Sequence, residues 1–214
     1  MHNYSIDSNK RIQFTTYITL ISVVMIFLIG IILNIFNIDF MPLEINIKTI
    51  GVLILKMFTL GITIFGGIYW VFDVYLWKWG IFTKLHKIPN LNGTWNGIFE
   101  SSKKDKGGLN YTGQCKMFIE QNWSKIKITC HFNQSISDSK TATIKVNGSE
   151  GIELSFDYYN NAQKTNGTTM KSHNGFNKLR YINDEDTLVG EYFNDKNRTT
   201  TGYLEVVRLI NTNN

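Results

Sequence analysis

The stretch TLVGEYFNDKNRTTTGYL, residues 187–204, carries an arginine where a β-hairpin has an inward-facing side chain. We expect two strands joined by a three-residue loop at 195–197, because the residues on both sides alternate as half-buried strands do. Side chains alternate between strand faces, so Arg198 shares the inward face with Tyr192 and Thr200. A guanidinium there is costly unless it meets an anion or a ring of acceptors. The predicted pairs are Asn194 with Arg198, Tyr192 with Thr200, Gly190 with Gly202, and Leu188 with Leu204.

The sequence offers little for catalysis. It contains no glycine-rich phosphate loop, no nucleophile elbow, no HExxH and no repeated carboxylate pair. His173 falls on an inward face, where Asp157 or Glu191 is a conceivable partner for general-base chemistry. A single inward histidine is more often a hydrogen-bonded core residue. We therefore expect a protein that is not an enzyme and has no catalytic residue, metal site or cofactor.

Charge and cysteine content argue against further classes. The 214 residues carry a net charge of +5, and the part after Pro89 has 15 basic against 13 acidic residues. This near-neutral balance argues against a broad basic surface for duplex nucleic acid. Cys115 and Cys130 are too few for a disulfide framework or a zinc site, and we expect both to be reduced and packed in a core.

Two apolar stretches precede the polar part of the chain. Residues 14–36 contain no charge, and 23 residues at 1.5 Å each are enough to cross a hydrocarbon layer of about 30 Å. A second stretch, residues 50–79, is interrupted by Lys56 and Asp73 and ends in tryptophans and tyrosine typical of a membrane–water interface. Residues 1–88 are thus predicted to form a transmembrane hairpin with short flanks.

Lysine and arginine counts predict the orientation of this hairpin. Two lie before the first span, one in the connection and three after the second, which favours cytoplasmic positions for both termini. Small and hydroxyl residues form stripes that allow helices to approach closely, either within the hairpin or between protomers. These stripes are Ser22, Gly30 and Asn34 in the first helix and Thr59, Thr63 and Gly67 in the second.

Residues 89–214 change to short alternating strands separated by polar turns. A turn at residues 122–123 is predicted to pair Cys115 with Cys130, and a turn at 147–151 to join two further strands. A loop of about a dozen residues leads to the strand HNGFNKLRYI, whose pairing places Tyr181 opposite Leu188 and Asn177 opposite Tyr192. About eight consecutive strands predict an antiparallel up-and-down, lipocalin-like β-barrel, which can hold a core or one small ligand.

Several motifs in this order resemble a known family. They are LNGTWNG at the start of the barrel, FDYYN at 156–160, H-x-G at 173–175, and L-x-G-x-Y-x-N followed by R-x-T-x-G from 188 to 202. With two preceding membrane helices, they resemble the β-strand-rich transmembrane effectors of bacterial cyclic-oligonucleotide anti-phage defence (CBASS). The chain departs from that pattern at Phe156, Ala162 and Lys196, which bears on ligand identity more than on class.

The resemblance implies a function. In that family the barrel is a receptor for a cyclic dinucleotide from a partner nucleotidyltransferase, and binding drives homo-oligomerisation, disruption of the bacterial inner membrane and cell death. Such a ligand offers two phosphates and two bases, so its pocket needs a guanidinium, hydroxyl and amide donors, and aromatic faces. The candidate ligand-binding residues are Trp95, Tyr158, Asn160, His173, Tyr192, Arg198 and Thr200.

Two other functions fit parts of the sequence. A membrane-anchored, lipocalin-like binder of a lipid or small metabolite requires an apolar barrel interior, which the inward Arg198 and His173 argue against. A structural membrane adaptor requires no pocket, and Trp95, Tyr158 and Tyr192 would then be only core residues. A filled barrel interior would favour the adaptor.

Overall fold

The computed structural model describes residues 1–36, 38, 46–105, 107–133, 135–162, 172–196 and 198–209. The chain forms two compact units. One is helical and covers Asn9–Phe82, and the other contains the strands and combines Met1–Ser8 with the chain from Thr83 onward. The first eight residues therefore belong to the β unit, whereas the sequence suggested one N-terminal portion up to residue 88. The loop expected before His173 lies outside the described residues.

Two long apolar helices make up most of the helical unit, α1 (Lys10–Ile35) and α2 (Ile47–Val74). Both are long and apolar enough to cross a membrane. Asn46 starts α2 with a capping box, because its side chain accepts the N–H groups of Lys48 and Thr49 while the Thr49 hydroxyl accepts from Asn46 N–H. The second helix was expected to reach residue 79. It ends at Val74, and a short turn, η1 (Leu76–Lys78), and helix α3 (Gly80–His86) follow.

Packing between α1 and α2 follows one row of α1. Gly61 of α2 lies opposite Ile26, since a Cβ added to this glycine would be 3.2 Å from Ile26 Cδ1. Thr59, Thr63 and Gly67 lie on an exposed face, so the second predicted stripe is not part of the packing within the hairpin. The buried residues of α1 are spaced by four and include two from the first stripe, namely Phe14, Ile18, Ser22, Ile26 and Gly30.

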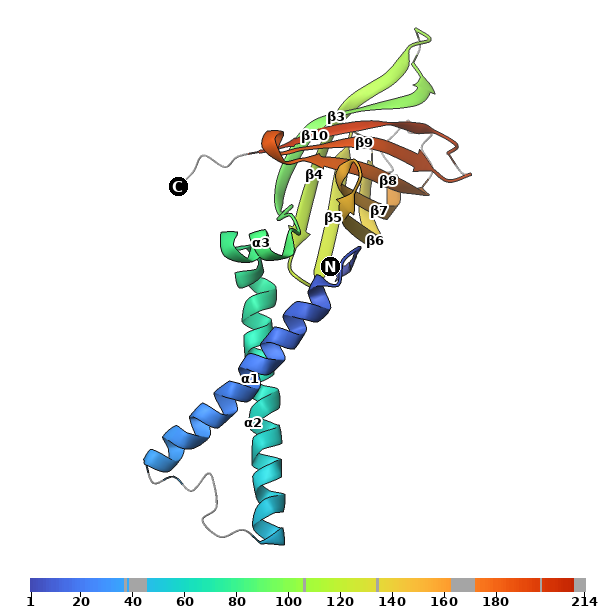
Figure 1. The fold of residues 1–214 in the computed structure, drawn as a ribbon. Coiled ribbons are helices and arrows are strands. Elements are labelled where there is room, and N and C mark those ends of the chain that lie inside the picture. Colours follow the sequence, from blue (N-terminus) through green and yellow to red (C-terminus); the bar gives the residue numbers. More distant parts are fainter. Residues whose placement is uncertain are drawn as a thin grey trace. The chain divides into compact units, whose positions relative to one another are not determined.

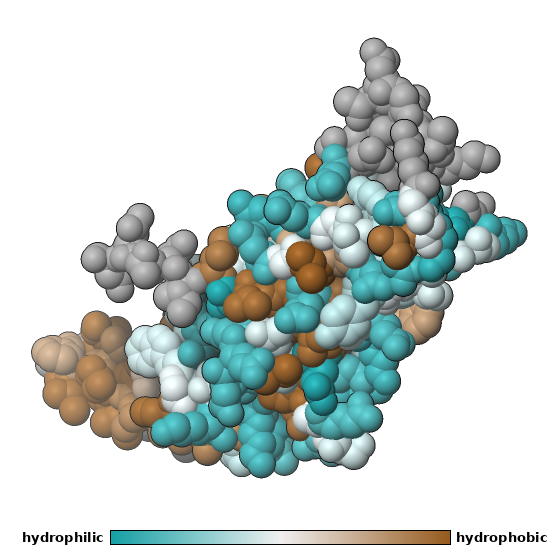
Figure 2. All heavy atoms as spheres, turned by 90° about the horizontal axis from the view of Figure 1, so that it is seen from above, coloured by the Kyte–Doolittle hydropathy of each residue, from teal (hydrophilic) through white to brown (hydrophobic). Residues whose placement is uncertain are grey.

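Eight antiparallel strands close into a barrel in the β unit (Figure 1). Each strand pairs with the next along the chain, and the last returns to pair with the first, so the predicted up-and-down barrel is confirmed. The face of this unit that Figure 2 shows is mainly hydrophilic, with apolar side chains in small groups. The strands are β3 (Gly93–Lys104), β4 (Asn110–Gln121), β5 (Lys125–Phe132), β6 (Ser135–Gly148), β7 (Gly151–Ala162), β8 (His173–Ile182), β9 (Thr187–Asn194) and β10 (Thr201–Arg208).

The β9–β10 hairpin has a different register from the predicted one. Tyr192 lies opposite Gly202 instead of Thr200, so the pairing is shifted by two residues. The cause is a wider loop, which closes where Asn194 N–H donates to Thr200 O, and in which Asp195 O accepts from the N–H groups of Arg198 and Thr199. A shift of two residues keeps every side chain on its predicted face.

The β4–β5 hairpin shows the same kind of correction. Met117 pairs with Cys130, and Cys115 pairs with Phe132 rather than with Cys130. The turn closes between Asn122 N–H and Lys125 O, which again moves the register by two residues. Both cysteines are free and buried, so their expected packing in the core is confirmed. The predicted pairs of Tyr181 with Leu188 and Asn177 with Tyr192 are confirmed, as is the turn between β6 and β7, where Gly148 pairs with Gly151.

The barrel interior has two halves. One half is filled by apolar side chains. They come from the first residues of β3, β5, β7 and β9 and from the last residues of β4, β6, β8 and β10. Its fully buried members include Trp95, Met117, Ile128, Ile144, Leu154, Leu179, Leu188 and Val206. The opposite half, where β5 meets β6 and β9 meets β10, is lined by polar and aromatic residues and contains a cavity.

Candidate functional site

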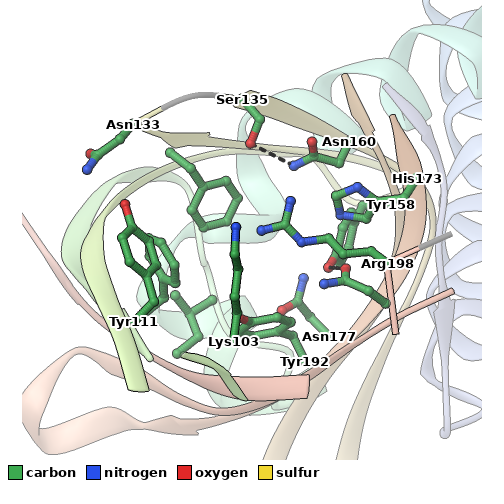
Figure 3. A pocket seen from close by; sticks show the side chains of 14 residues that line it. Lys103, Tyr111, Asn133, Ser135, Tyr158, Asn160, His173, Asn177, Tyr192 and Arg198 are labelled. Carbon is green, nitrogen blue, oxygen red and sulfur yellow. Dashed lines mark hydrogen bonds between the residues drawn. The ribbon is translucent and has the colours of Figure 1, made fainter. Parts of the chain in front are cut away.

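The cavity opens at one end of the barrel and offers about 900 Å³ of space, with the solvent at its mouth included. The enclosed part of this space is about 210 Å³, so a ligand of more than a few atoms would also extend into the mouth. All eight strands or their connections contribute to the wall (Figure 3). The lining residues are Phe99, Lys103, Tyr111, Phe132, Asn133, Ser135, Tyr158, Asn160, His173, Asn177, Tyr192, Asn194, Arg198 and Leu204.

Two basic side chains, those of Lys103 and Arg198, extend from different walls toward the middle of the cavity (Figure 3). Lys103 comes from the end of β3, and Arg198 from the loop between β9 and β10. Neither forms an ion pair with a described residue, and no aspartate or glutamate is among the residues that line the cavity. The cavity therefore has a positive charge that an anionic ligand can neutralise.

Two tyrosines lie flat against the wall because glycines make room for them. A Cβ added to Gly175 would overlap the Tyr158 ring, and one added to Gly202 would overlap the ring of Tyr192. Burial raises the pKa of both tyrosines, so their hydroxyls remain protonated in the physiological range. The Tyr158 hydroxyl donates to Asn194 Oδ1 at 2.7 Å. The rings thus provide fixed aromatic surfaces with neutral hydroxyls.

Asn160 provides a buried amide at the cavity wall. Its side chain is 4% exposed, and its Nδ2 donates to the Ser135 hydroxyl at 3.0 Å. Its Oδ1 accepts no hydrogen bond from a described residue, although it is buried. An unsatisfied buried acceptor costs free energy, which a ligand N–H or O–H would recover. His173, also 4% exposed, lies directly opposite Asn160 on β8.

The structure brings five of the seven predicted residues together around the cavity: Tyr158, Asn160, His173, Tyr192 and Arg198. Trp95 and Thr200 lie elsewhere. Trp95 is fully buried in the filled half, where its indole N–H donates to Leu91 O and the Arg208 guanidinium lies 4.6 Å from its ring centroid. The Thr200 hydroxyl accepts a 2.7 Å hydrogen bond from Asn194 Nδ2, so it holds the loop that carries Arg198.

Sequence reasoning missed most of the opposite wall. Phe99 and Phe132 pack edge to face with ring centroids 5.2 Å apart, and Tyr111 lies 5.9 Å from Phe99. Asn177 could have been found from the sequence, because it was expected to pair with Tyr192, which was a candidate ligand-binding residue. Lys103 gave no signal, because it lies in a run of charged residues that reads as an exposed turn. The lining residues that were not predicted are Phe99, Lys103, Tyr111, Phe132, Asn133, Ser135, Asn177, Asn194 and Leu204.

Comparison with known proteins agrees with this geometry. Residues 86–208, which contain all eight barrel strands, match the family described as Cap15, cyclic dinucleotide receptor domain. The chain is also 34% identical over 146 residues to CD-NTase-associated protein 15 of Yersinia aleksiciae, an alignment that covers 68% of each chain. The resemblance to CBASS effectors is thereby confirmed, and the chain belongs to the Cap15 family, whose β-barrel is a cyclic dinucleotide receptor domain.

Proposed function

We propose that the cavity of this barrel binds one cyclic dinucleotide, made by a partner nucleotidyltransferase of the same defence system. The observation that carries the proposal is the composition of the wall. Two cations, five aromatic rings and four asparagine side chains surround one space that opens to solvent, and none of the described lining residues is a carboxylate. Phosphates, base faces and base edges are the three features that such a wall complements.

Different residues bind the phosphates, the base faces and the base edges of the ligand. Arg198 and Lys103 each bind a phosphate, the first through its planar guanidinium and the second as a point charge. Tyr158 and Tyr192 offer ring faces to the bases, since aromatic stacking contributes about 1–3 kcal/mol per base. Asn160 Oδ1 accepts an N–H group from a base edge, which satisfies a buried acceptor that has no partner among the described residues.

The two alternative functions fit this site less well. A lipid-binding barrel needs an apolar interior, and here the open half carries two cations and several amides. A structural adaptor needs no cavity at all, and here only half of the barrel interior is filled. Neither alternative explains why an arginine and a lysine extend toward the same space.

We infer that the output is mechanical and takes place in the bacterial inner membrane. The helices α1 and α2 span the bilayer as a hairpin, and ligand binding promotes homo-oligomerisation that disrupts the membrane and kills the infected cell. Both termini are cytoplasmic in this arrangement. Two observations support it: Met1–Ser8 and the barrel form one compact unit, and two candidate spans separate them along the chain, which returns the chain to the same side.

Calorimetry on the full-length protein in detergent tests the ligand. We expect one cyclic dinucleotide from a panel of purine and pyrimidine members to bind with one molecule per protomer. Linear dinucleotides of the same bases should bind more weakly, because they pay the ordering cost that cyclisation removes. If no member binds, or if fatty acids compete for the cavity, the proposal is wrong.

A further inference from the structure

The barrel has a seam that its eight strands do not close. β5 and β6 pair only from Thr129 to Phe132 and from Ser135 to Asp138, close to the cavity, and then diverge. The first residues of the chain occupy the gap. Strand β1 (His2–Asn3) pairs with β5, with Asn3 opposite Lys125, and strand β2 (Ser5–Ile6) pairs in parallel with β6. Met1–Ser8, named here the N-terminal strap, thus covers two strand edges.

A few side chains hold the strap in the seam. Tyr4 is 3% exposed, and its hydroxyl accepts from Gln121 Nε2 at 3.2 Å and donates to Asn122 O at 3.3 Å. The Asp7 carboxylate accepts two backbone N–H groups, those of Val146 and Asn147. Tyr4 is the only fully buried residue of the strap, and each of its strands has two residues. The strap therefore has one fully buried side chain and is otherwise docked by hydrogen bonds, so it can open locally without exposing the apolar half of the barrel.

The strap is sensitive to the distance between β5 and β6. Only Tyr4 separates Asn3, which is bound to β5, from Ser5, which is bound to β6. At the point of divergence, the Ser139 hydroxyl accepts from Ile128 N–H of β5 at 2.9 Å and is 2.7 Å from His2 Nε2 of the strap. If β5 shifts relative to β6, the strap therefore loses its contacts with one of the two strands.

The same two strands form part of the cavity wall. Phe132 ends β5, Ser135 begins β6, and Asn133 lies between them, and all three line the cavity. Ser135 is four residues before Ser139, the β6 residue that contacts His2 of the strap. A ligand that contacts the β5–β6 turn therefore acts on the strands that hold the strap.

The other end of the strap continues into the first apolar helix. Asp7, its last anchor, is followed by Ser8 and Asn9, and α1 begins at Lys10. We propose that the seam is a strand-binding site for the N-terminal strap, and that ligand binding releases the strap and thereby passes the signal to α1. This inference rests on the proposed function, and it adds the segment through which the receptor acts on the membrane helix. A ligand shifts this equilibrium because it favours the released state.

A reversible covalent lock tests the release. Ser5 Oγ and Thr143 Oγ1 are 2.6 Å apart on paired strands, and Ser5 is exposed while Thr143 is half-buried, so S5C/T143C places two thiols in position for a disulfide that an oxidant can reach. Cys115 and Cys130 are buried and do not compete. The full-length variant is reconstituted into phospholipid vesicles that contain a self-quenched dye, and oxidised with diamide. The ligand is the cyclic dinucleotide of the panel that binds most tightly.

We expect the oxidised double variant to bind this ligand more weakly than the reduced form, because the disulfide holds the docked state, and to release no dye even at saturating ligand until dithiothreitol opens the disulfide. The single variants S5C and T143C should release dye in both redox states. In the reduced double variant, ligand should slow the formation of the disulfide. Dye release by the oxidised double variant, or a rate of disulfide formation that ligand leaves unchanged, would overturn the inference. A protein that binds no member of the panel in either redox state contradicts the proposed function, and the inference with it.

Discussion

The hydroxyl of Tyr158 donates a 2.7 Å hydrogen bond to Oδ1 of Asn194, across the space that Gly175 leaves without a side chain. Tyr158 is on β7 and Asn194 ends β9, so the bond passes over β8 and ties three strands together at the cavity. Asn194 in turn donates through Nδ2 to the Thr200 hydroxyl. This chain of bonds fixes both ends of the loop that carries Arg198.

Replacing Tyr158 by phenylalanine removes the first of these bonds and leaves the ring in place. We expect a loss of about 1 kcal/mol in the free energy of unfolding, which lowers the melting temperature by roughly 2 to 4 °C. Tyr159→Phe is the matched control, because its ring points outward under Lys140 and is 42% exposed. Differential scanning fluorimetry in detergent measures both, and equal melting temperatures for the two variants would contradict the role of the Tyr158 hydroxyl.

Arg198 is expected to supply the strongest ligand contact. A charge-assisted hydrogen bond contributes about 1.5 to 3 kcal/mol, so Arg198→Ala should weaken cyclic dinucleotide binding by roughly tenfold to a hundredfold. Arg198→Lys should recover only part of this loss, because an ammonium cannot bind a phosphate in a bidentate way. Calorimetry provides the affinities, and circular dichroism checks that the barrel is folded. An unchanged affinity in the folded alanine variant would remove Arg198 from the site.

Lys103 and Lys104 are neighbours on β3 with different surroundings, which makes them a matched pair. Lys103 lines the cavity, whereas Lys104 Nζ donates to Asn110 Oδ1 in the β3–β4 hairpin. Lys103 is exposed, so its attraction to a phosphate is screened by salt. We expect Lys103→Ala to weaken binding at low salt by less than Arg198→Ala does, and to reduce the dependence of affinity on salt. Lys104→Ala should leave both quantities unchanged, and equal effects of the two substitutions would argue against a specific contact of Lys103.

The class and face of most barrel elements were predictable from the sequence because alternation alone determines them. Leu188, Leu204 and Tyr192 occupy their predicted faces even though the hairpin register differs by two residues. The shift arises from the loop, where Thr199 has a positive φ of 46° and the Asp195 carbonyl accepts two N–H groups. Such loop geometry is not encoded in a pattern of apolar and polar residues. Turn chemistry therefore determined the registers, whereas the hydrophobic pattern determined the faces.

The candidate site was predictable only where its residues lay in motifs. Tyr158, Asn160 and His173 belong to such motifs, whereas Phe99 and Phe132 were indistinguishable from core residues until the cavity placed them at its wall. Trp95 shows the opposite case, because an aromatic residue in a prominent motif serves the filled half of the barrel. The N-terminal strap had no signal at all, since strands of two residues are too short for any periodicity.

Alkaline pH should reduce stability through the buried tyrosines. Burial raises the pKa of Tyr158, and burial together with the Asp186 carboxylate raises the pKa of Tyr181 to about 12. An unfolded tyrosine loses its proton at about pH 10, so the folded state holds a proton that the unfolded state has lost above this pH. The contribution of these tyrosines to the free energy of unfolding is thus fully present below about pH 10. It is lost as the pH rises through the pKa values of the folded state.

We therefore expect the melting temperature to fall above about pH 10, and to fall less steeply in Tyr181→Phe than in the parent protein. Absorbance at the tyrosinate band, compared between the parent protein and Tyr158→Phe, should show that Tyr158 ionises later than free tyrosine. Ionisation of Tyr158 in the ordinary range, or identical pH profiles for Tyr181→Phe and the parent protein, would contradict the assignment.

The proposed assembly of the membrane helices can be tested at Gly67. Space for a larger side chain exists there within one protomer, because a Cβ added at Gly67 meets no atom within 4 Å. Thr59 and Thr63 lie on the same face of α2, and their hydroxyls donate to carbonyls of their own helix, so this face is small and smooth. Close approach of a second α2 helix requires such a face. Gly67→Leu should therefore leave the hairpin and the cavity intact and prevent association.

Gly66 provides the control, because it is equally open and lies about 100° away around the helix. Ligand affinity, measured by calorimetry in detergent, should be the same in Gly66→Leu, Gly67→Leu and the parent protein. In cells that make the ligand, Gly67→Leu should lose toxicity and ligand-dependent crosslinking, whereas Gly66→Leu should retain most of both. Gly61→Leu should behave differently again, since its side chain would meet Ile26 of α1 and disturb the hairpin itself. If Gly67→Leu still kills and crosslinks, the exposed stripe faces only lipid, and association of the protomers must use another surface.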